Sequence, residues 1–293
     1  MNKTINIDKL TPHIGAEITG IDLSKPLEPE QVKLIESSLM ENQVVFFRDQ
    51  EMTLAEQVRL GGYFGKLYTH PAAQAATTAN KQPGKTAPMR YVSGVEGYPE
   101  IIKIYADANS EQVAGEVWHA DVTSETEPPM GSILRITQIP PLGGDTLFAS
   151  MYAAFEALSK DMQRFLCSLT AIHDGIKVYG GRNAYDSTRQ YPRNEHPVVR
   201  THPVTGRQAL YVSTTFTTKI VQLSQSESDA LLAFLFHHLE LPMFQCRFRW
   251  RNNSMAFWDN RCVQHQAQWD YFPHTRIGYR VQITGDRPFH KSS

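Results

Sequence analysis

The sequence predicts an α+β protein, and three observations support this. Many short apolar runs have the length and spacing of strands, whereas only a few stretches have the spacing of amphipathic helices. The chain has 293 residues, 41% hydrophobic and 20% charged, so it can bury a sizeable core. No linker composition divides it. We therefore expect a single domain over residues 1–293, built on an antiparallel barrel or jelly roll with flanking helices.

The elements are predicted from hydrophobic periodicity and capping residues. Val32, Ile35 and Leu39 share one helix face, and Ser224 and Glu227 form a capping box before an apolar run. The predicted helices cover residues 28–42, 151–169, 224–240 and the start of 53–65, up to its glycines. The predicted strands cover residues 42–50, 100–106, 116–123, 131–137, 146–150, 208–213, 244–250, 254–260 and 276–285.

Charge and cysteine content argue against several classes of protein. The formal net charge is −1 without a long basic or acidic run, so nucleic acid and anionic membranes are not expected partners. Cys167, Cys246 and Cys262 match no zinc or disulfide framework, which fits a reducing compartment. The N-terminal stretch lacks the apolar core of a signal peptide, and no apolar run approaches the roughly 20 residues of a membrane span. We expect a soluble cytoplasmic protein.

The stretch EVWHADVT, residues 116–123, places a histidine and an aspartate two positions apart. In an extended strand, residues i and i+2 point to the same side, so His119 and Asp121 would converge while Trp118 and Val122 face the other way. Taken alone, the pattern also fits a histidine–aspartate hydrogen bond on a solvated face.

The strand predicted near the end of the chain has two different faces. Ile277, Tyr279, Val281 and Ile283 alternate on the apolar face. The other face carries Arg276, Gly278, Arg280 and Gln282. Two cations with a glycine between them to leave room indicate an anion site lining a cavity. The alternative is a solvated edge strand with exposed arginines.

Together these features suggest a metal site. Two histidines and one carboxylate around open coordination positions form the facial triad of non-haem Fe(II) oxygenases, and His119, Asp121 and His265 could supply it. The same three ligands could hold catalytic zinc. The arginines favour iron, because a 2-oxo dicarboxylate cosubstrate needs a cation at its far carboxylate.

Four motifs follow in order: WHADVT, GGDT, WDNRxxxHxxxxDY and RIGYRVQITGDRPF. In this order and spacing the chain resembles the taurine dioxygenase (TauD/TfdA) family of Fe(II)/2-oxoglutarate-dependent dioxygenases. The resemblance runs from IGAEITGIDLSKPL near the start to GDRPF near the end, and so covers nearly the whole chain. It implies a distorted double-stranded β-helix, a form of the jelly roll, with Fe(II) as the metal and 2-oxoglutarate and O₂ as cosubstrates.

The resemblance also implies roles for individual residues. The metal ligands fall on His119, Asp121 and His265, and the 2-oxoglutarate contacts on Thr146 and Arg276. The residues that fall at substrate-binding positions are His70, Val122, Tyr179, Phe216 and Arg280. The other histidines, including His173, His196, His202, His237 and His238, are assigned no chemistry.

The chain departs from the taurine-oxidising members at three places. Ala73 and Gly115 replace a tyrosine and an asparagine, and the loop at 72–90 is longer. The stretch HPAA is instead similar to the alkyl-sulfatase members. These differences predict a roomier pocket than taurine needs.

The expected activity is oxidation of a small anionic organic molecule. Because Arg280 and His70 together match the three oxygens of a sulfur oxyanion, an organosulfonate or alkyl sulfate ester is preferred, with release of sulfite or sulfate. The alternatives are a carboxylate substrate such as an aryloxyalkanoate or an amino-acid-derived acid, a zinc-dependent hydrolase, and a non-catalytic metal-binding jelly roll. A homo-oligomer, dimer or tetramer, is an open possibility.

Overall fold

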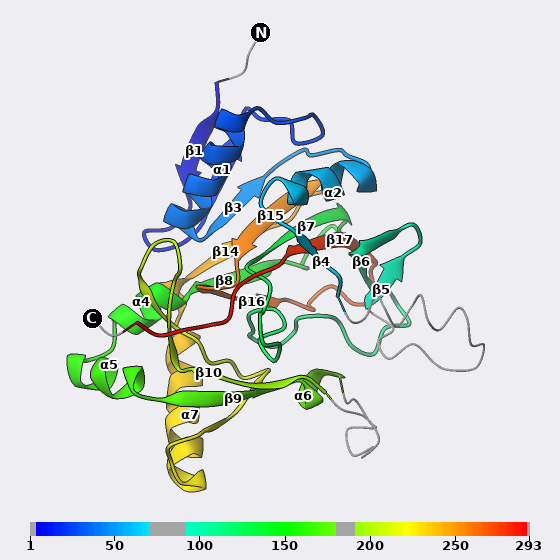
Figure 1. Cartoon of the computed structure of the whole chain (residues 1–293). Coiled ribbons are helices and arrows are strands. Elements are labelled where there is room, and N and C mark those ends of the chain that lie inside the picture. The colour runs from blue at the N-terminus through cyan, green and yellow to red at the C-terminus, as the bar shows by residue number, and fades with distance from the viewer. Residues whose placement is uncertain (1–3, 71–91, 180–190, 292–293) are drawn as a thin grey trace.

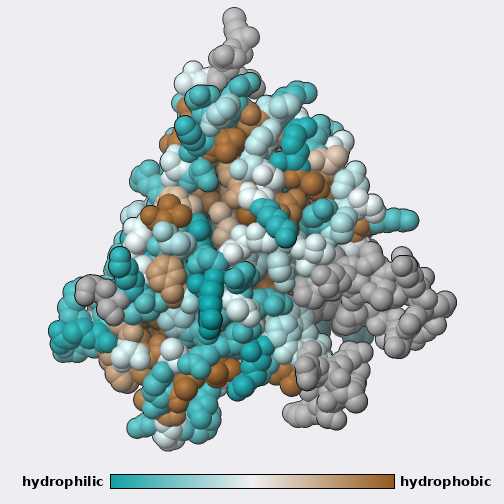
Figure 2. All heavy atoms as spheres, in the orientation of Figure 1, coloured by the Kyte–Doolittle hydropathy of each residue, from teal (hydrophilic) through white to brown (hydrophobic). Residues whose placement is uncertain are grey.

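The computed structural model describes residues 4–70, 92–179 and 191–291 (Figure 1). The predicted surface loop at 72–90, together with Ala73, lies outside these ranges. Among the described helices, the longest has 15 residues, and none could cross a lipid bilayer. On the face drawn in Figure 2, hydrophobic residues form small groups among hydrophilic ones, including at the end built from α5 (Lys160–Cys167) and α7 (Gln225–Leu239).

The largest sheet has nine strands, in the order β1-β2-β3-β15-β7-β17-β6-β5, with β4 paired to β17. All neighbours are antiparallel except the parallel pair β2 and β3. Its strands are β1 (Asn6–Lys9), β2 (Ala16–Thr19), β3 (Val44–Phe47), β4 (Leu67–Tyr68), β5 (Val92–Val95), β6 (Tyr98–Ala106), β7 (Gly131–Gln138), β15 (Ser254–Asp259) and β17 (Arg276–Ile283).

A second, three-stranded sheet packs against the interior face of the first. It has the order β14 (Gln245–Phe248), β8 (Thr146–Ser150), β16 (Val263–Ala267). Aromatic rings pack between the two sheets. Phe46 of β3 stacks on Phe248 of β14 with 4.0 Å between the ring centroids, and the ring centroids of Phe148 in β8 and Trp258 in β15 lie 5.7 Å apart. The core between two antiparallel sheets is the arrangement of a jelly roll.

Helices cover the outer face of the large sheet. The helices α1 (Pro29–Asn42) and α2 (Leu54–Gly62) pack Ile35, Leu39 and Leu60 onto the same cluster as Val45 and Phe47. Since β3 is buried on both faces, its sequence VVFF is an uninterrupted apolar run.

The remaining elements lie at the other end of the molecule (Figure 1). They are α4 (Met151–Glu156), α5, β9 (Thr170–Asp174), α6 (Ile176–Tyr179), β10 (Arg193–Pro197), β11 (Val199–Thr201), β12 (Gln208–Leu210), β13 (Thr217–Ile220), α7 and a 3₁₀ turn at Pro242–Phe244. Helices therefore flank the β core at both ends.

Two local predictions were wrong. Residues 151–169 form two helices, because Ser159 caps the second one by accepting a hydrogen bond from the Met162 N–H and so ends the first. Residues 116–123 are not a strand. His119 forms an isolated antiparallel bridge, and the chain turns at Val122, whose φ is +54°. The alternation of faces therefore stops before Val122.

Candidate metal and cosubstrate site

The structure brings His119, Asp121 and His265 to one point. His119 and His265 are paired through two backbone hydrogen bonds, of 3.2 and 2.8 Å, between the ligand loop and β16. Their ring centroids lie 4.2 Å apart, and Asp121 Oδ1 lies 3.7 Å from His119 Nε2. All three side chains are buried, and their candidate ligand atoms lie within 4.8 Å of one another. This donor set fits a divalent metal ion with open positions.

Both imidazoles are in the form that binds a metal. His119 Nδ1 lies 2.8 Å from the carbonyl oxygen of Val117, which can only accept, so Nδ1 carries the proton and the Nε2 lone pair is left for a ligand. Burial lowers the pKa of His119 and holds the pKa of His265 well below its usual value. The His265 ring makes no side-chain hydrogen bond within the described part of the chain. Neutral, uncommitted rings of this kind suit coordination.

The Asp121 carboxylate is held by donors on both of its oxygens. Oδ2 accepts a 2.6 Å hydrogen bond from the Ser132 hydroxyl, and Oδ1 accepts a 2.8 Å bond from Arg280 Nη1. Although burial alone would raise the pKa of Asp121, the Arg280 guanidinium holds that pKa well below its usual range. The carboxylate is therefore ionised, as a metal ligand must be.

A polar network behind Asp121 fixes its orientation. The Asn260 side chain accepts from the Asp121 backbone N–H at 3.2 Å and from Trp258 Nε1 at 2.9 Å, and it donates to Ser132 Oγ at 3.1 Å. Gln282 donates to the same Ser132 hydroxyl at 3.2 Å. The sequence reasoning assigned Asn260 and Ser132 no role. Asn260 lies in the WDNR motif, which was a usable signal, whereas nothing local marks Ser132.

Thr146 and Arg276 are linked through one tryptophan. Trp250 Nε1 donates to Thr146 Oγ1 at 2.9 Å, and the Arg276 guanidinium carbon lies 5.7 Å from the Trp250 ring. Arg276 is buried, and burial lowers its pKa. Its Nε donates to the Gly144 carbonyl at 3.2 Å, and its two terminal nitrogens have no hydrogen-bond partner among the residues the structure places. A buried fork of this kind fits a carboxylate.

Four of the five predicted substrate residues lie near Asp121: His70, Val122, Tyr179 and Arg280. The ring of His70 lies 6.5 Å from that of Tyr179, and burial, with a smaller effect from the charge of Arg280, lowers the pKa of His70 to about 3. Val122 follows Asp121 directly and is buried. Phe216 is linked to the ligand loop less directly, because its neighbour Thr215 donates to the Trp118 carbonyl. The roles of all five residues stay predictions.

Two glycines near the site are each packed against a side chain. A Cβ at Gly115 would lie 3.1 Å from Cε1 of the His119 ring, so this glycine lets the ring of a candidate metal ligand lie close to the backbone. Gly278 was expected to leave room for a ligand between Arg276 and Arg280, and this was wrong. A Cβ there would lie 2.6 Å from Ile136 Cδ1, so the space is filled by a core side chain of β7. The two arginines are nevertheless buried, and β17 is an inner strand.

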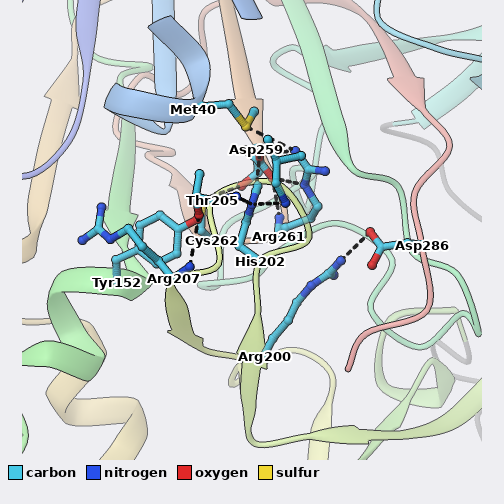
Figure 3. Close-up of polar contacts among 11 residues, drawn as sticks. Met40, Tyr152, Arg200, His202, Thr205, Arg207, Asp259, Arg261, Cys262 and Asp286 are labelled. Atoms are coloured by element: carbon cyan, nitrogen blue, oxygen red, sulfur yellow. Dashed lines mark hydrogen bonds and ion pairs between the residues drawn. The ribbon is translucent and has the colours of Figure 1, made fainter. Parts of the chain in front are cut away.

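A second group of metal-type side chains, His202, Asp259 and Cys262, is internally paired (Figure 3). Arg261 donates to both oxygens of Asp259, at 2.8 and 2.6 Å, and His202 Nε2 donates to Oδ2 at 3.0 Å. His202 Nδ1 accepts from two backbone N–H groups in the turn that follows. Burial raises the pKa of Cys262 well above its usual value. With these lone pairs occupied and the thiol protonated, this group is a structural brace.

Comparison with known proteins identifies the family. A sequence model of the taurine catabolism dioxygenase TauD, TfdA family matches residues 6–282. An alpha-ketoglutarate-dependent sulfonate dioxygenase of Saccharomyces cerevisiae is 33% identical, covering 97% of this chain and 68% of its own. An alkylsulfatase of Acinetobacter baylyi is 32% identical, covering 96% of this chain and 86% of its own.

A solved structure gives the same result for the fold. A taurine dioxygenase from Burkholderia xenovorans matches with a TM-score of 0.80 at 36% identity, covering 98% of this chain and 91% of that one. The predicted jelly-roll core with flanking helices is confirmed, and so is the predicted dependence on 2-oxoglutarate. The chain belongs to the TauD/TfdA family of 2-oxoglutarate-dependent dioxygenases.

Proposed function

We propose that this dioxygenase uses Fe(II) to oxidise a small organosulfonate or alkyl sulfate ester, releasing sulfite or sulfate. The observation that carries the proposal is the convergence of His119, Asp121 and His265 beside two buried arginines with different surroundings. One arginine, Arg276, has an unpaired fork, and the other, Arg280, lies against the metal-ligand carboxylate.

His119, Asp121 and His265 would hold the Fe(II), and their two imidazoles and one carboxylate suit this metal. When bound, the iron supplies O₂ activation coupled to oxidative decarboxylation of 2-oxoglutarate to succinate and CO₂. Asp121 contributes the negative charge, and the bonds from Ser132 and Asn260 keep that carboxylate and its backbone in place.

Arg276 would bind the far carboxylate of 2-oxoglutarate through its two terminal nitrogens, and Thr146 would donate its hydroxyl to the same group. The bond from Arg276 Nε to the Gly144 carbonyl fixes the plane of the fork before the cosubstrate arrives. Burial of the pair keeps water out of this contact and strengthens it.

Arg280 and His70 would bind the anionic group of the substrate. Arg280 lies four positions after Arg276, which is about 13 Å along an extended strand, so one carboxylate cannot reach both. A sulfonate or sulfate offers three oxygens: the arginine fork can take two, and His70 can donate to the third. The names of the yeast and Acinetobacter relatives, a sulfonate dioxygenase and an alkylsulfatase, support a sulfur oxyanion.

The site would place the carbon that bears the sulfur group next to the metal. Hydroxylation of that carbon gives an unstable product, in which the hydroxyl loses its proton as the carbon–sulfur or carbon–oxygen bond breaks. An aldehyde then leaves together with sulfite or sulfate.

A substrate screen tests this proposal. Enzyme, Fe(II), 2-oxoglutarate and O₂ are incubated with taurine, longer alkylsulfonates, alkyl sulfates and aryloxyalkanoates, while sulfite, sulfate and succinate are measured. We expect longer alkylsulfonates or alkyl sulfates to stimulate succinate formation, with sulfite or sulfate released in equal amount. Succinate stimulated only by carboxylates would overturn the substrate class and leave the dioxygenase activity standing. Cytoplasmic location and assembly as a dimer or tetramer stay predictions from the sequence.

A further inference from the structure

The two oxygens of Asp121 have different partners. Oδ2 accepts a hydrogen bond from the Ser132 hydroxyl. Oδ1 is the oxygen that lies 3.7 Å from His119 Nε2, and it therefore faces the place where a metal would bind. The same Oδ1 lies 2.8 Å from Arg280 Nη1. A metal ion and a guanidinium would thus share one oxygen atom.

Arg280 depends on Asp121 for its neutralisation. The arginine is buried, and its Nε makes no hydrogen bond to any residue that the structure describes. Asp121 is the one carboxylate within ion-pair distance of it in the described ranges. Because both partners are buried, water and salt screen the interaction weakly, and a charge added to or removed from either partner is felt strongly by the other.

We propose that Arg280 couples anion binding to metal binding. The guanidinium, by sharing Oδ1, weakens the affinity of His119, Asp121 and His265 for a divalent cation. An anion bound to Arg280 offsets this charge, so the anion and the metal strengthen each other's binding. The inference rests on the proposed function in one respect, since the natural anion would be the sulfonate or sulfate group of the substrate.

The direction of the effect follows from charge. A divalent ion on Oδ1 lies near a guanidinium of like charge in a water-poor site, which opposes its binding. Adding one negative charge at Arg280 removes most of that opposition. By thermodynamic linkage the two binding affinities must change by the same factor, and typical coupling of this kind is about 5- to 150-fold. The enzyme would therefore hold its metal most firmly when the anion is present.

Mn(II) titration with free ion measured by electron paramagnetic resonance tests the coupling without turnover. Hexanesulfonate serves as the anion probe. In the wild type, saturating hexanesulfonate should tighten Mn(II) binding at least about 5-fold. Arg280→Gln should bind Mn(II) at least about 5-fold more tightly than the wild type and should not respond to hexanesulfonate. Arg280→Lys keeps the positive charge and should bind Mn(II) as the wild type does.

Two further variants distinguish a failure of the proposed metal site from a failure of the proposed coupling. Arg135→Gln removes a buried arginine that contacts Gln57 and not Asp121, so Mn(II) affinity and the response to hexanesulfonate should stay as in the wild type. Asp121→Ala should abolish Mn(II) binding, and survival of that binding would refute the proposed metal site itself. If Asp121→Ala fails to bind while Arg280→Gln binds no more tightly than the wild type, only the coupling is refuted. Should Arg280→Gln fail to fold, a wild-type Mn(II) affinity that hexanesulfonate leaves unchanged refutes it equally.

Discussion

The described part of the chain contains two buried clusters of similar side chains, of which one is a candidate metal site and the other is a structural brace. In one, His119 and Asp121 meet His265. In the other, His202 and Asp259 meet Cys262. Both aspartates are ionised and both lie beside an arginine. Composition and burial therefore do not distinguish a metal site from a structural brace in this protein.

The position of one proton on each histidine does distinguish them. His119 Nδ1 faces a carbonyl oxygen, so the proton is on Nδ1 and Nε2 offers a lone pair to the site. His202 Nδ1 accepts from two backbone N–H groups, so the proton is on Nε2 and is donated to Asp259. The local backbone around each ring thus decides whether the histidine can bind a metal or can only donate a hydrogen bond.

The arginines differ in the same way. Arg261 contacts both oxygens of Asp259 and leaves that carboxylate saturated. Arg280 makes a single contact with Asp121, through an oxygen that also faces the ligand histidines. Each Asp121 oxygen has one donor and keeps a lone pair for a metal, whereas each Asp259 oxygen accepts two hydrogen bonds and has none left.

The largest effect should come from the ligand cluster. Replacing His119, Asp121 or His265 with alanine should abolish succinate formation, because the metal loses a ligand. Circular dichroism should show that the fold persists, with Asp121→Ala the least stable of the three because it leaves Arg280 buried without its carboxylate. His202→Ala is the matched control from the brace, and its folded fraction should still bind metal. Full activity of Asp121→Ala with Fe(II) restored would contradict the assignment.

Substitutions in the brace should instead lower the stability of the fold. Asp259→Asn leaves Arg261 buried without a carboxylate, which should lower the free energy of unfolding by about 3–5 kcal/mol, measured by urea denaturation. Asp161→Asn, which removes an exposed partner of Arg164, should change it by less than about 1 kcal/mol. Loss of metal binding in Asp259→Asn at unchanged stability would show that the second cluster is functional after all.

Arg276 extends the comparison to a buried arginine that has no carboxylate of its own. Arg276→Ala should raise the 2-oxoglutarate concentration needed for half-maximal activity, because the far carboxylate would be buried unpaired at a cost of about 2–5 kcal/mol. The exposed Arg249 provides the control, and Arg249→Ala should leave that concentration unchanged. An unchanged 2-oxoglutarate requirement in Arg276→Ala would place the cosubstrate elsewhere.

The smallest effect concerns the orientation of Asp121. Ser132→Ala removes the donor to Oδ2 without changing any charge, and it should weaken Mn(II) binding by about 10- to 100-fold. Ser228 is also buried, and its hydroxyl accepts from the Ile220 N–H away from the site. Ser228→Ala should therefore leave Mn(II) affinity unaltered. Equal effects from the two serines would indicate general destabilisation.

Features with a local cause were predictable from the sequence. The run at 44–47 is apolar because both faces of β3 are buried, and the capping box of Ser224 and Glu227 begins α7 where expected. The three candidate ligands came from motif order, and the structure brings them together. The break at Ser159 was missed because the apolar pattern continues through it, although a serine is a common helix cap.

Features that depend on strand register were not predictable. Ser132 reaches Asp121 and Asn260 because β7 pairs with β15 so that Ser132 lies opposite Trp258. The turn at Val122 places a β-branched residue at positive φ, which local preferences oppose. Gly278 accommodates Ile136 from a strand far away in the sequence. In each case the conformation or contact depends on the tertiary structure, which the local sequence does not reveal.

The backbone bridge between His119 and His265 has a consequence for how the protein is made. The ribosome adds His265 long after His119, and the two residues meet only when β16 has joined β8 in the small sheet. A partly synthesised chain therefore offers only isolated donors, which bind a metal weakly. Stable metallation should follow completion of the β core rather than guide it, and a nascent chain that ends before β16 should retain no metal through purification.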